Sequence, residues 1–362
     1  MADVSGFAST FMLCAVAACL CGCSKSDPET MTGTLERPLR VASENVGEVN
    51  VYTHRHYPTD QALYEKFTAD TGISVNIIKA KADELIKKLE IEGADSRADL
   101  LITVDAGRLV RAKQKNLLQP VTSPVLEANI PAHLRDPEGY WCGLTVRARV
   151  IVYAKDRVRP ADLSTYEALT DQRWQGKVLI RSSKNIYNQS LLASFIHHSG
   201  AGPAEKWATD MVATMARTPK GNDRDQIKAV VAGVGDVAVV NTYYVGLLLN
   251  SDNPKEREIA EQVGIFFPNQ DDRGTHINIS GAGVTAAAPN KDNAIKLLEF
   301  LSSEASQKSF AMSNYEYPLK ATTEKSPLLT AWGNFKADAL NLSALGELNA
   351  EAVKTFDRAG WR

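Results

Sequence analysis

Cysteine is scarce in most of this chain, and its scarcity limits how the fold can be held together. Four of the five cysteines lie within the first 23 residues, at Cys14, Cys19, Cys21 and Cys23. Cys142 alone remains in the rest of the chain, and one cysteine cannot form an internal disulfide. We therefore expect a hydrophobic core to hold the fold. Nothing near Cys142 supplies a partner for a catalytic dyad, so the sequence predicts a buried free thiol.

Basic patches and a serine-nucleophile motif are also lacking. The formal net charge is −2, and lysine and arginine form no run or cluster. Because nucleic-acid binding needs a concentrated positive surface, this composition argues against a nucleic-acid partner. No Gly-x-Ser-x-Gly segment occurs, so the sequence gives no support for a hydrolase of the catalytic-triad type.

Long hydrophobic runs are missing, and the longest apolar stretch has the length of a signal peptide. Phe11 to Leu20 is too short to span a bilayer as a helix. The segment Leu20-Cys-Gly-Cys23 follows and resembles the lipobox of bacterial lipoproteins. It predicts a signal peptide over residues 1–22, lipidation at Cys23 and a polar tether over residues 23–45. The alternative is an ordinary cleaved secretion signal. Either interpretation places the protein in the periplasm or at the exterior of the cell envelope.

Beyond the tether, strand-like and helix-like patterns alternate in two successive series. Apolar alternation or short apolar runs indicate strands over 49–52, 72–78, 98–104, 149–153, 177–180, 236–242 and 277–285. Helical spacing of apolar residues indicates helices over 60–69, 82–92, 107–116, 188–198, 203–215, 225–232 and 292–310. Such an order is typical of an α/β fold with parallel strands and helical crossovers. The length suggests two domains of modest size.

Tyr243 and Tyr244 are adjacent and directly follow one of the expected strands. A pair of phenolates is a hard, anionic oxygen donor set that suits Fe(III) better than soft metals. Because a free tyrosine has a pKa near 10, metal binding at neutral pH must displace the phenol protons. Thr242 is a suitable N-cap for a helix beginning here, and the positive end of that helix would favour phenolates. The alternative interpretation is a pair of amphipathic residues in a cleft wall.

Seven short segments occur in an order and spacing that resemble those of the ferric-iron-binding lipoproteins and periplasmic proteins of ABC importers. The segments are Val51–Tyr57, Arg147–Tyr153, Trp174–Val178, Tyr187–Ser190, Asn241–Tyr244, His276–Gly283 and Asn314–Pro318. The resemblance covers nearly the whole mature chain and is strongest to the tyrosine-rich branch found in cyanobacteria and related bacteria. It implies a two-lobed periplasmic binding protein fold of type II, with two crossover strands and a ligand cleft between the lobes. One lobe would comprise residues 46–145 and 272–319, and the other residues 146–271 and 320–362.

The same resemblance implies a cargo, a partner and a ligand set. The protein would capture Fe(III) as a monomer and deliver it to an inner-membrane ABC permease. The implied iron ligands are His56, Tyr57, Tyr187, Tyr243 and Tyr244. Relatives that use a carboxylate ligand carry a Glu after the first helix, and Tyr57 stands in its place here. His54 is an alternative imidazole, and a cleft-wall aromatic is the alternative for Tyr187.

Charge considerations extend the expected site. Four phenolates and a neutral imidazole around Fe(III) leave a charge of −1, which Arg147 or Arg55 could balance. An ordinary surface ion pair is an equal alternative for Arg147 and Arg149. A synergistic anion such as carbonate, held by Ser182 and Ser183, could complete the coordination.

Two other functions remain open at this stage. The fold could bind a small organic or anionic ligand, because it accommodates many ligands. A non-haem ferric enzyme would also use tyrosine and histidine, but it needs an open coordination position for its substrate. Five protein ligands leave little room for one, so the sequence favours a binding protein over an enzyme.

Overall fold

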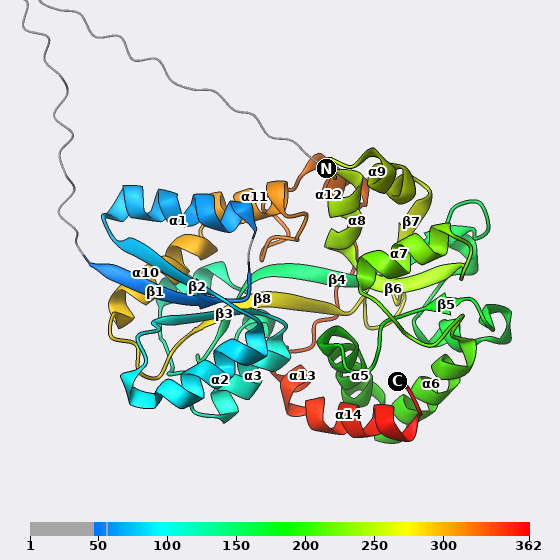
Figure 1. Cartoon of the computed structure of the whole chain (residues 1–362), viewed down its shortest axis with the longest axis horizontal. Coiled ribbons are helices and arrows are strands. Elements are labelled where there is room, and N and C mark those ends of the chain that lie inside the picture. Colours follow the sequence, from blue (N-terminus) through cyan, green and yellow to red (C-terminus); the bar gives the residue numbers. More distant parts are fainter. Residues whose placement is uncertain (1–46, 56) are drawn as a thin grey trace, which may run out of the picture. The chain divides into compact units, whose positions relative to one another are not determined.

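Strands and helices alternate along residues 47–55 and 57–362, the part of the chain that the computed structural model describes (Figure 1). The strands are β1 (Glu48–Thr53), β2 (Ser74–Lys79), β3 (Leu100–Val104), β4 (Cys142–Ala154), β5 (Val178–Leu179), β6 (Val237–Asn241), β7 (Val263–Phe266) and β8 (Ile277–Val284). Several of them, including β3, β6 and β8, are buried along their whole length, as expected for strands covered on both faces.

The strands follow the order β2-β1-β3-β8-β4-β6-β5, with β7 also paired to β4. β1 is parallel to β2 and β3, and β5 is parallel to β6, whereas β8 is antiparallel to both β3 and β4. The long strand β4 changes partners along its length. Its first part, residues 142–148, pairs with β8, and Arg149–Tyr153 pairs with β6. β4 and β8 therefore connect the β1–β3 group to the β5–β7 group (Figure 1).

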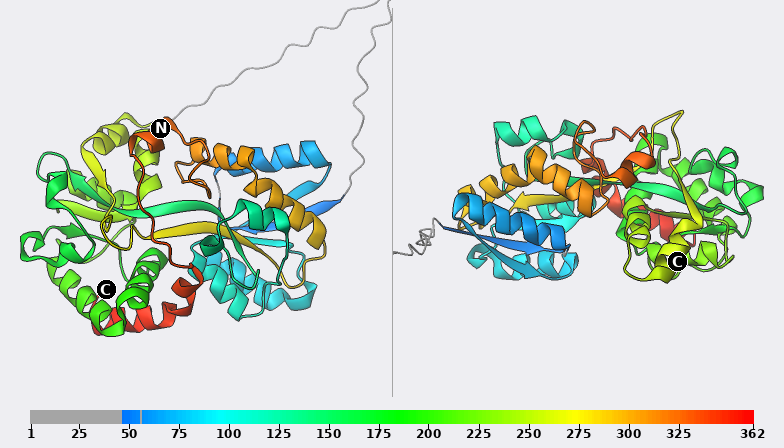
Figure 2. Two further views of the ribbon diagram at one scale, coloured as in Figure 1. Left: turned by 180° about the vertical axis from the view of Figure 1, so that it is seen from behind. Right: turned by 90° about the horizontal axis from the view of Figure 1, so that it is seen from above.

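Helices cover both groups of strands. They are α1 (Pro58–Thr71), α2 (Ala82–Glu92), α3 (Ala106–Gln114), α4 (Pro124–Asn129), α5 (Ile186–Ser199), α6 (Ala201–Thr214), α7 (Asp223–Val231), α8 (Thr242–Leu249), α9 (Pro254–Glu261), α10 (Lys291–Ser302), α11 (Glu304–Ser313), α12 (Pro327–Ala331), α13 (Ser343–Glu347) and α14 (Asn349–Arg358). α14 packs against α5 and α6, while α13 contacts both α3 and α5 (Figure 2). The C-terminal helices thus link helices from the two groups.

Two elements differ from the sequence prediction. The expected helix over 292–310 is two helices, because Ser303 adopts an extended conformation between α10 and α11. Its side chain accepts a hydrogen bond from the backbone N–H of Ser306 and caps α11. β4 is also much longer than the strand expected over 149–153, because its first half pairs with a strand that lies far away in the sequence.

Four predictions fall outside the described residues: the signal peptide over 1–22, the tether over 23–45, the lipid site Cys23 and the candidate ligand His56. None of the helices in residues 47–55 and 57–362 has the length and apolar character that a bilayer-crossing helix needs.

Candidate metal centre

Tyr243 and Tyr244 lie in the first turn of α8, immediately after the buried strand β6. The N-cap is Asn241 rather than the expected Thr242, which is the first helical residue. The two rings are close, with centroids 4.2 Å apart. Both phenols therefore lie at the positive end of a helix, where negative charge is stabilised.

Tyr187 and Tyr57 also lie at helix starts. Tyr187 is the second residue of α5, and its backbone N–H donates to the side chain of the N-cap Asn185. Tyr57 is the N-cap residue of α1, with Pro58 at the first helical position, where proline is well tolerated. Three helices from distant parts of the sequence thus each present tyrosine at the N-terminal end.

One cavity of about 470 Å³ is lined by all four tyrosines. The hydroxyl oxygens of Tyr187 and Tyr243 are 3.4 Å apart. His54 also lines this cavity, next to Arg55. The structure therefore brings Tyr57, Tyr187, Tyr243 and Tyr244 together, and we call this space the tyrosine cavity.

The charged residues lining the tyrosine cavity carry positive charge. They are Arg55, Arg108, Arg181 and Arg224, and no aspartate or glutamate lines it among the described residues. Burial raises the pKa of Tyr57, Tyr243 and Tyr244 above the usual value for a phenol, while nearby arginines oppose that rise at Tyr57 and Tyr243. Without metal, these phenols are protonated at neutral pH. The cavity can then hold them as phenolates only when a cation replaces their protons.

Arg147 lies beside the tyrosines and is also part of a buried ion-pair cluster. It does not line the cavity, although its guanidinium carbon lies 5.4 Å from the centroid of the Tyr243 ring. It forms an ion pair with Glu316 at 2.7 Å, and Arg55 pairs with Glu316 and Asp60, each at 2.9 Å. Two arginines are thus matched by two carboxylates in one buried cluster. The surface ion pair considered for Arg147 and Arg149 is wrong, because both side chains are buried, at 1% and 2% exposure.

A second arginine cluster lies beside Tyr187. Arg149 and Arg181 share the single carboxylate of Asp223, at 3.2 and 2.8 Å. Their guanidinium carbons lie 5.9 and 5.7 Å from the centroid of the Tyr187 ring. Two cations and one anion leave a formal charge of +1 beside Tyr187. Sequence reasoning missed Arg181 and Asp223, and it also missed Glu316 although that residue lay within a segment carrying the family resemblance.

Ser182 and Ser183 are not among the residues that line the tyrosine cavity. The hydroxyl of Ser182 accepts from the backbone N–H of Lys184, and the N–H of Ser183 donates to the carbonyl of Arg362. These contacts engage the backbone N–H of Ser183, whereas the Ser182 hydroxyl acts only as an acceptor. Arg108 and Arg224, by contrast, line the cavity.

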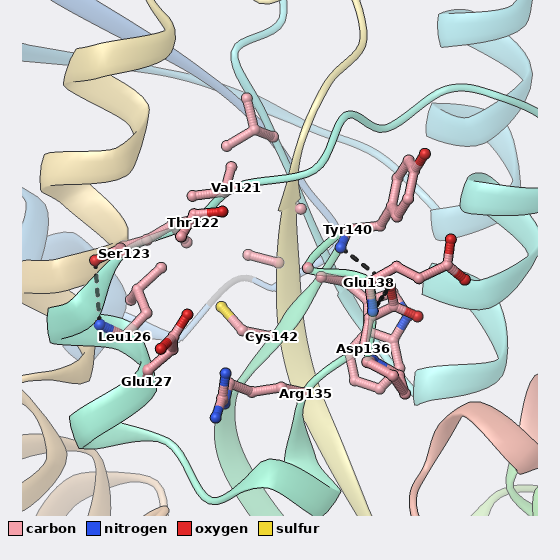
Figure 3. A pocket seen from close by; sticks show the side chains of 17 residues that line it. Val121, Thr122, Ser123, Leu126, Glu127, Arg135, Asp136, Glu138, Tyr140 and Cys142 are labelled. Atoms are coloured by element: carbon pink, nitrogen blue, oxygen red, sulfur yellow. Dashed lines mark hydrogen bonds between the residues drawn. The ribbon is translucent and has the colours of Figure 1, made fainter.

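Cys142 lies in a separate pocket, at the start of β4 (Figure 3). The pocket is also lined by Ser123, Glu127, Arg135 and Asp136, and by none of the four clustered tyrosines. Burial raises the pKa of the Cys142 thiol to about 12, although the nearby Arg135 opposes the rise. The predicted buried free thiol is confirmed. Among the described residues, no group of three or more His, Cys, Asp or Glu side chains could hold a metal ion.

The buried Glu316 cluster makes a testable contribution to stability. Glu316→Gln removes the charge that both Arg55 and Arg147 face, so we expect the metal-free protein to lose about 3 kcal/mol of unfolding free energy, as for other broken buried pairs. Urea unfolding monitored by circular dichroism measures this loss. Glu351→Gln is the matched control, because its ion pair with Arg358 lies at the surface, with side chains 36% and 44% exposed, and contributes little. Equal midpoints for the two variants would contradict the assigned role of Glu316.

Comparisons with known proteins agree with this architecture. Residues 95–337 match the model of a family described as bacterial extracellular solute-binding protein. Iron uptake protein A1 of Synechocystis is 51% identical over 315 residues, covering 87% of this chain and 88% of that protein. The structure of Trichodesmium IdiA (FutA) in complex with iron and citrate ligands is 52% identical, with a TM-score of 0.86, and covers 87% of this chain and 100% of that one.

A ferric binding protein from Campylobacter jejuni also has a similar structure, with 45% identity, a TM-score of 0.82 and coverage of 87% of this chain and 100% of that one. These structures confirm the predicted fold class, the type II periplasmic binding protein fold. The family match spans more than half of the chain. This protein therefore belongs to the bacterial extracellular solute-binding proteins.

Proposed function

We propose that this protein captures Fe(III) outside the cytoplasmic membrane and delivers it to an ABC permease. The observation that carries the proposal is the convergence of Tyr57, Tyr187, Tyr243 and Tyr244 on one cavity. The names of the iron-binding relatives support the same cargo. His56 completes the proposed ligand set, as the resemblance implied.

The donor chemistry and the charges fit this cargo. Phenolate oxygens are hard ligands and favour Fe(III) over soft metals. Four phenolates and a neutral imidazole around Fe(III) carry −1, and the Arg149–Arg181–Asp223 cluster carries +1 beside Tyr187. The charge of this cluster offsets the charge of the proposed metal–ligand set, which reduces the cost of burying it.

A bound anion is the second component of the proposed cargo. The Trichodesmium relative was solved with iron and citrate. In this chain, Arg108 and Arg224 line the tyrosine cavity, and no ion pair is present for Arg224 among the described residues. A carboxylate or carbonate anion that bridges iron to these arginines would complete the coordination if one phenolate is missing.

We further propose that bound iron holds two lobes together in a closed state. One lobe comprises residues 46–145 and 272–319, and the other comprises residues 146–271 and 320–362. Tyr57 belongs to the first lobe, and Tyr187, Tyr243 and Tyr244 belong to the second. Coordination from both sides favours the closed state, because a ligand shifts such an equilibrium only through its different affinity for the two states. Strands β4 and β8 are the connections about which the lobes would move.

The positive lining of the tyrosine cavity favours a second candidate function, the binding of an organic anion without iron. The absorption spectrum of the purified protein, recorded with and without ferric iron, distinguishes the two. Fe(III)–phenolate coordination produces a visible charge-transfer band and a red or orange colour, whereas an organic anion produces none. A colourless protein after saturation with ferric citrate would reject the iron proposal. A ferric enzyme would in addition turn over catechol-type substrates, and we expect no such turnover.

We propose that the protein reaches its site through lipidation at Cys23, in the periplasm or at the exterior of the cell envelope. Cys23→Ala should release the protein from washed membranes into the soluble fraction, because the remaining tether is polar. Immunoblots of the two fractions from a bacterial host measure the change. Cys21→Ala is the control and should keep the protein on the membrane. Retention of the Cys23→Ala variant would show that the anchor is wrong.

A further inference from the structure

A second and larger cavity, of about 680 Å³, lies beside strands β4 and β8 and is also lined by the segment that follows α11. Its walls are apolar and include Leu134, Val146, Ile277, Tyr317, Leu319 and Phe335. We call this space the back cavity. Its volume falls within the range of small-molecule sites, and an apolar lining is typical of them. It shares no lining residue with the tyrosine cavity.

The charged residues that line the back cavity are basic. Lys320 forms no ion pair and its side chain makes no hydrogen bond with the described residues. Lys325 donates to the side-chain oxygen of Asn334 at 3.1 Å. No aspartate or glutamate lines this space in residues 47–55 and 57–362. An apolar wall with unmatched ammonium groups is complementary to an apolar molecule that carries one negative charge.

An unsatisfied hydroxyl gives a second indication of a ligand. Tyr317 lines the back cavity and is 6% exposed, and its hydroxyl has no hydrogen-bond partner among the described residues. A buried donor without a partner costs free energy, so a ligand oxygen that reached it would be stabilising. The ring itself stays in place through an edge contact with Phe335, whose ring stacks on Phe267.

The back cavity and the tyrosine cavity are adjacent to the same pair of extended segments. Val146 and Tyr317 exchange both backbone hydrogen bonds, at 2.8 and 2.7 Å, and both residues line the back cavity. Their neighbours Arg147 and Glu316 form the buried ion pair beside Tyr243. Because successive side chains of a strand point to opposite faces, Val146 and Arg147 lie on opposite faces of β4, with Val146 at the back cavity and Arg147 beside Tyr243.

We propose that the back cavity binds a small apolar carboxylate, such as a medium-chain or aromatic acid, and that its occupancy is coupled to the tyrosine cavity. The carboxylate lies near Lys320 and Lys325, and the apolar body packs between Tyr317, Phe335 and the crossover strands. Binding of the carboxylate is independent of the proposed function, whereas its coupling to the tyrosine cavity rests on that function. The coupling acts through the Val146–Tyr317 pairing. A ligand in the back cavity and iron in the tyrosine cavity both shift the conformation of this pairing.

Calorimetric titration of the full-length, metal-free protein with octanoate tests the binding. Octylammonium, with the same chain and the opposite charge, should bind at least about tenfold more weakly. Lys320→Glu should weaken octanoate binding by a similar factor, and Ala321→Trp should abolish it by filling the space from an exposed position on the lining. Lys255→Glu, an exposed lysine on α9, is the matched control and should bind as the unmodified protein does. Absent octanoate binding, or equal binding to all three variants, overturns the proposal.

The coupling is tested by a separate measurement. Thermodynamic linkage requires that octanoate and iron change each other's affinity by the same factor. Saturating octanoate should change the ferric affinity of the unmodified protein, and iron should change the octanoate affinity by the same factor. Ala321→Trp should remove the effect of octanoate on iron while leaving iron binding itself intact. If octanoate binds and neither affinity changes, the coupling is wrong. If octanoate binds and the protein takes up no iron, both the proposed function and the coupling are wrong. The proposed ligand of the back cavity is then still supported.

Discussion

Tyr243→Phe should weaken ferric binding by more than about 100-fold, because it removes a proposed metal ligand, and even residues that only support metal ligands contribute 10–100-fold. The substitution keeps the ring, so its packing against Tyr244 and the adjacent Arg147 remains. The visible charge-transfer band should shift and lose intensity, since one of the phenolates that produce it is gone. Competition against citrate, followed at the charge-transfer band, measures the affinity.

Tyr64→Phe is the matched control for this experiment. Tyr64 is also a buried tyrosine, on α1, but it does not line the tyrosine cavity. Its substitution should leave both the spectrum and the ferric affinity unchanged. Unfolding of both variants without metal separates a binding defect from a folding defect, and we expect similar stabilities. An unchanged band for Tyr243→Phe would mean that the tyrosine pair is only a cleft wall, and binding of an organic anion would replace the iron proposal.

The clustering of the tyrosines was predictable because local sequence determines where each one lies. Tyr243 follows the apolar run of β6, and Tyr187 follows the capping residue of α5, so both lie at helix starts. Ligands gather at the carboxyl ends of strands in α/β sheets, and this rule brings such residues together. The errors in predicting where these helices begin were small. The N-cap before Tyr243 is Asn241 instead of Thr242, a shift of one residue that is common at helix ends.

The charges around the site were not predictable, because they depend on residues far apart in the sequence. Arg55 and Glu316 are separated by 261 positions, and no local pattern marks them as partners. The same holds for Arg149 and Asp223, which are 74 positions apart. The sequence therefore named Arg147 and Arg55 as candidate balancing charges without showing that both pair with Glu316. Only the folded chain shows that Arg149 and Arg181 share the single carboxylate of Asp223.

The raised pKa values of the clustered tyrosines predict that iron binding releases protons and weakens in acid. Burial keeps Tyr57, Tyr243 and Tyr244 protonated well above neutral pH. Each phenol that coordinates iron must lose its proton, so each contributes about a tenfold fall in ferric affinity for every unit by which pH decreases. If these pKa values were depressed instead, the phenolates would already exist and the affinity would change little between pH 6 and 8.

Counting the released protons tests this mechanism directly. A pH-stat titration with ferric nitrilotriacetate at pH 7 measures the protons released per iron bound. The chelator contributes equally in every variant, so differences between variants belong to the protein. Tyr243→Phe, titrated at protein concentrations high enough to load it, should release about one proton fewer than the unmodified protein, because one phenol no longer ionises. Tyr64→Phe should release the same number as the unmodified protein. If loaded Tyr243→Phe also releases that number, Tyr243 does not bind iron as a phenolate, and the metal centre must be built from other groups.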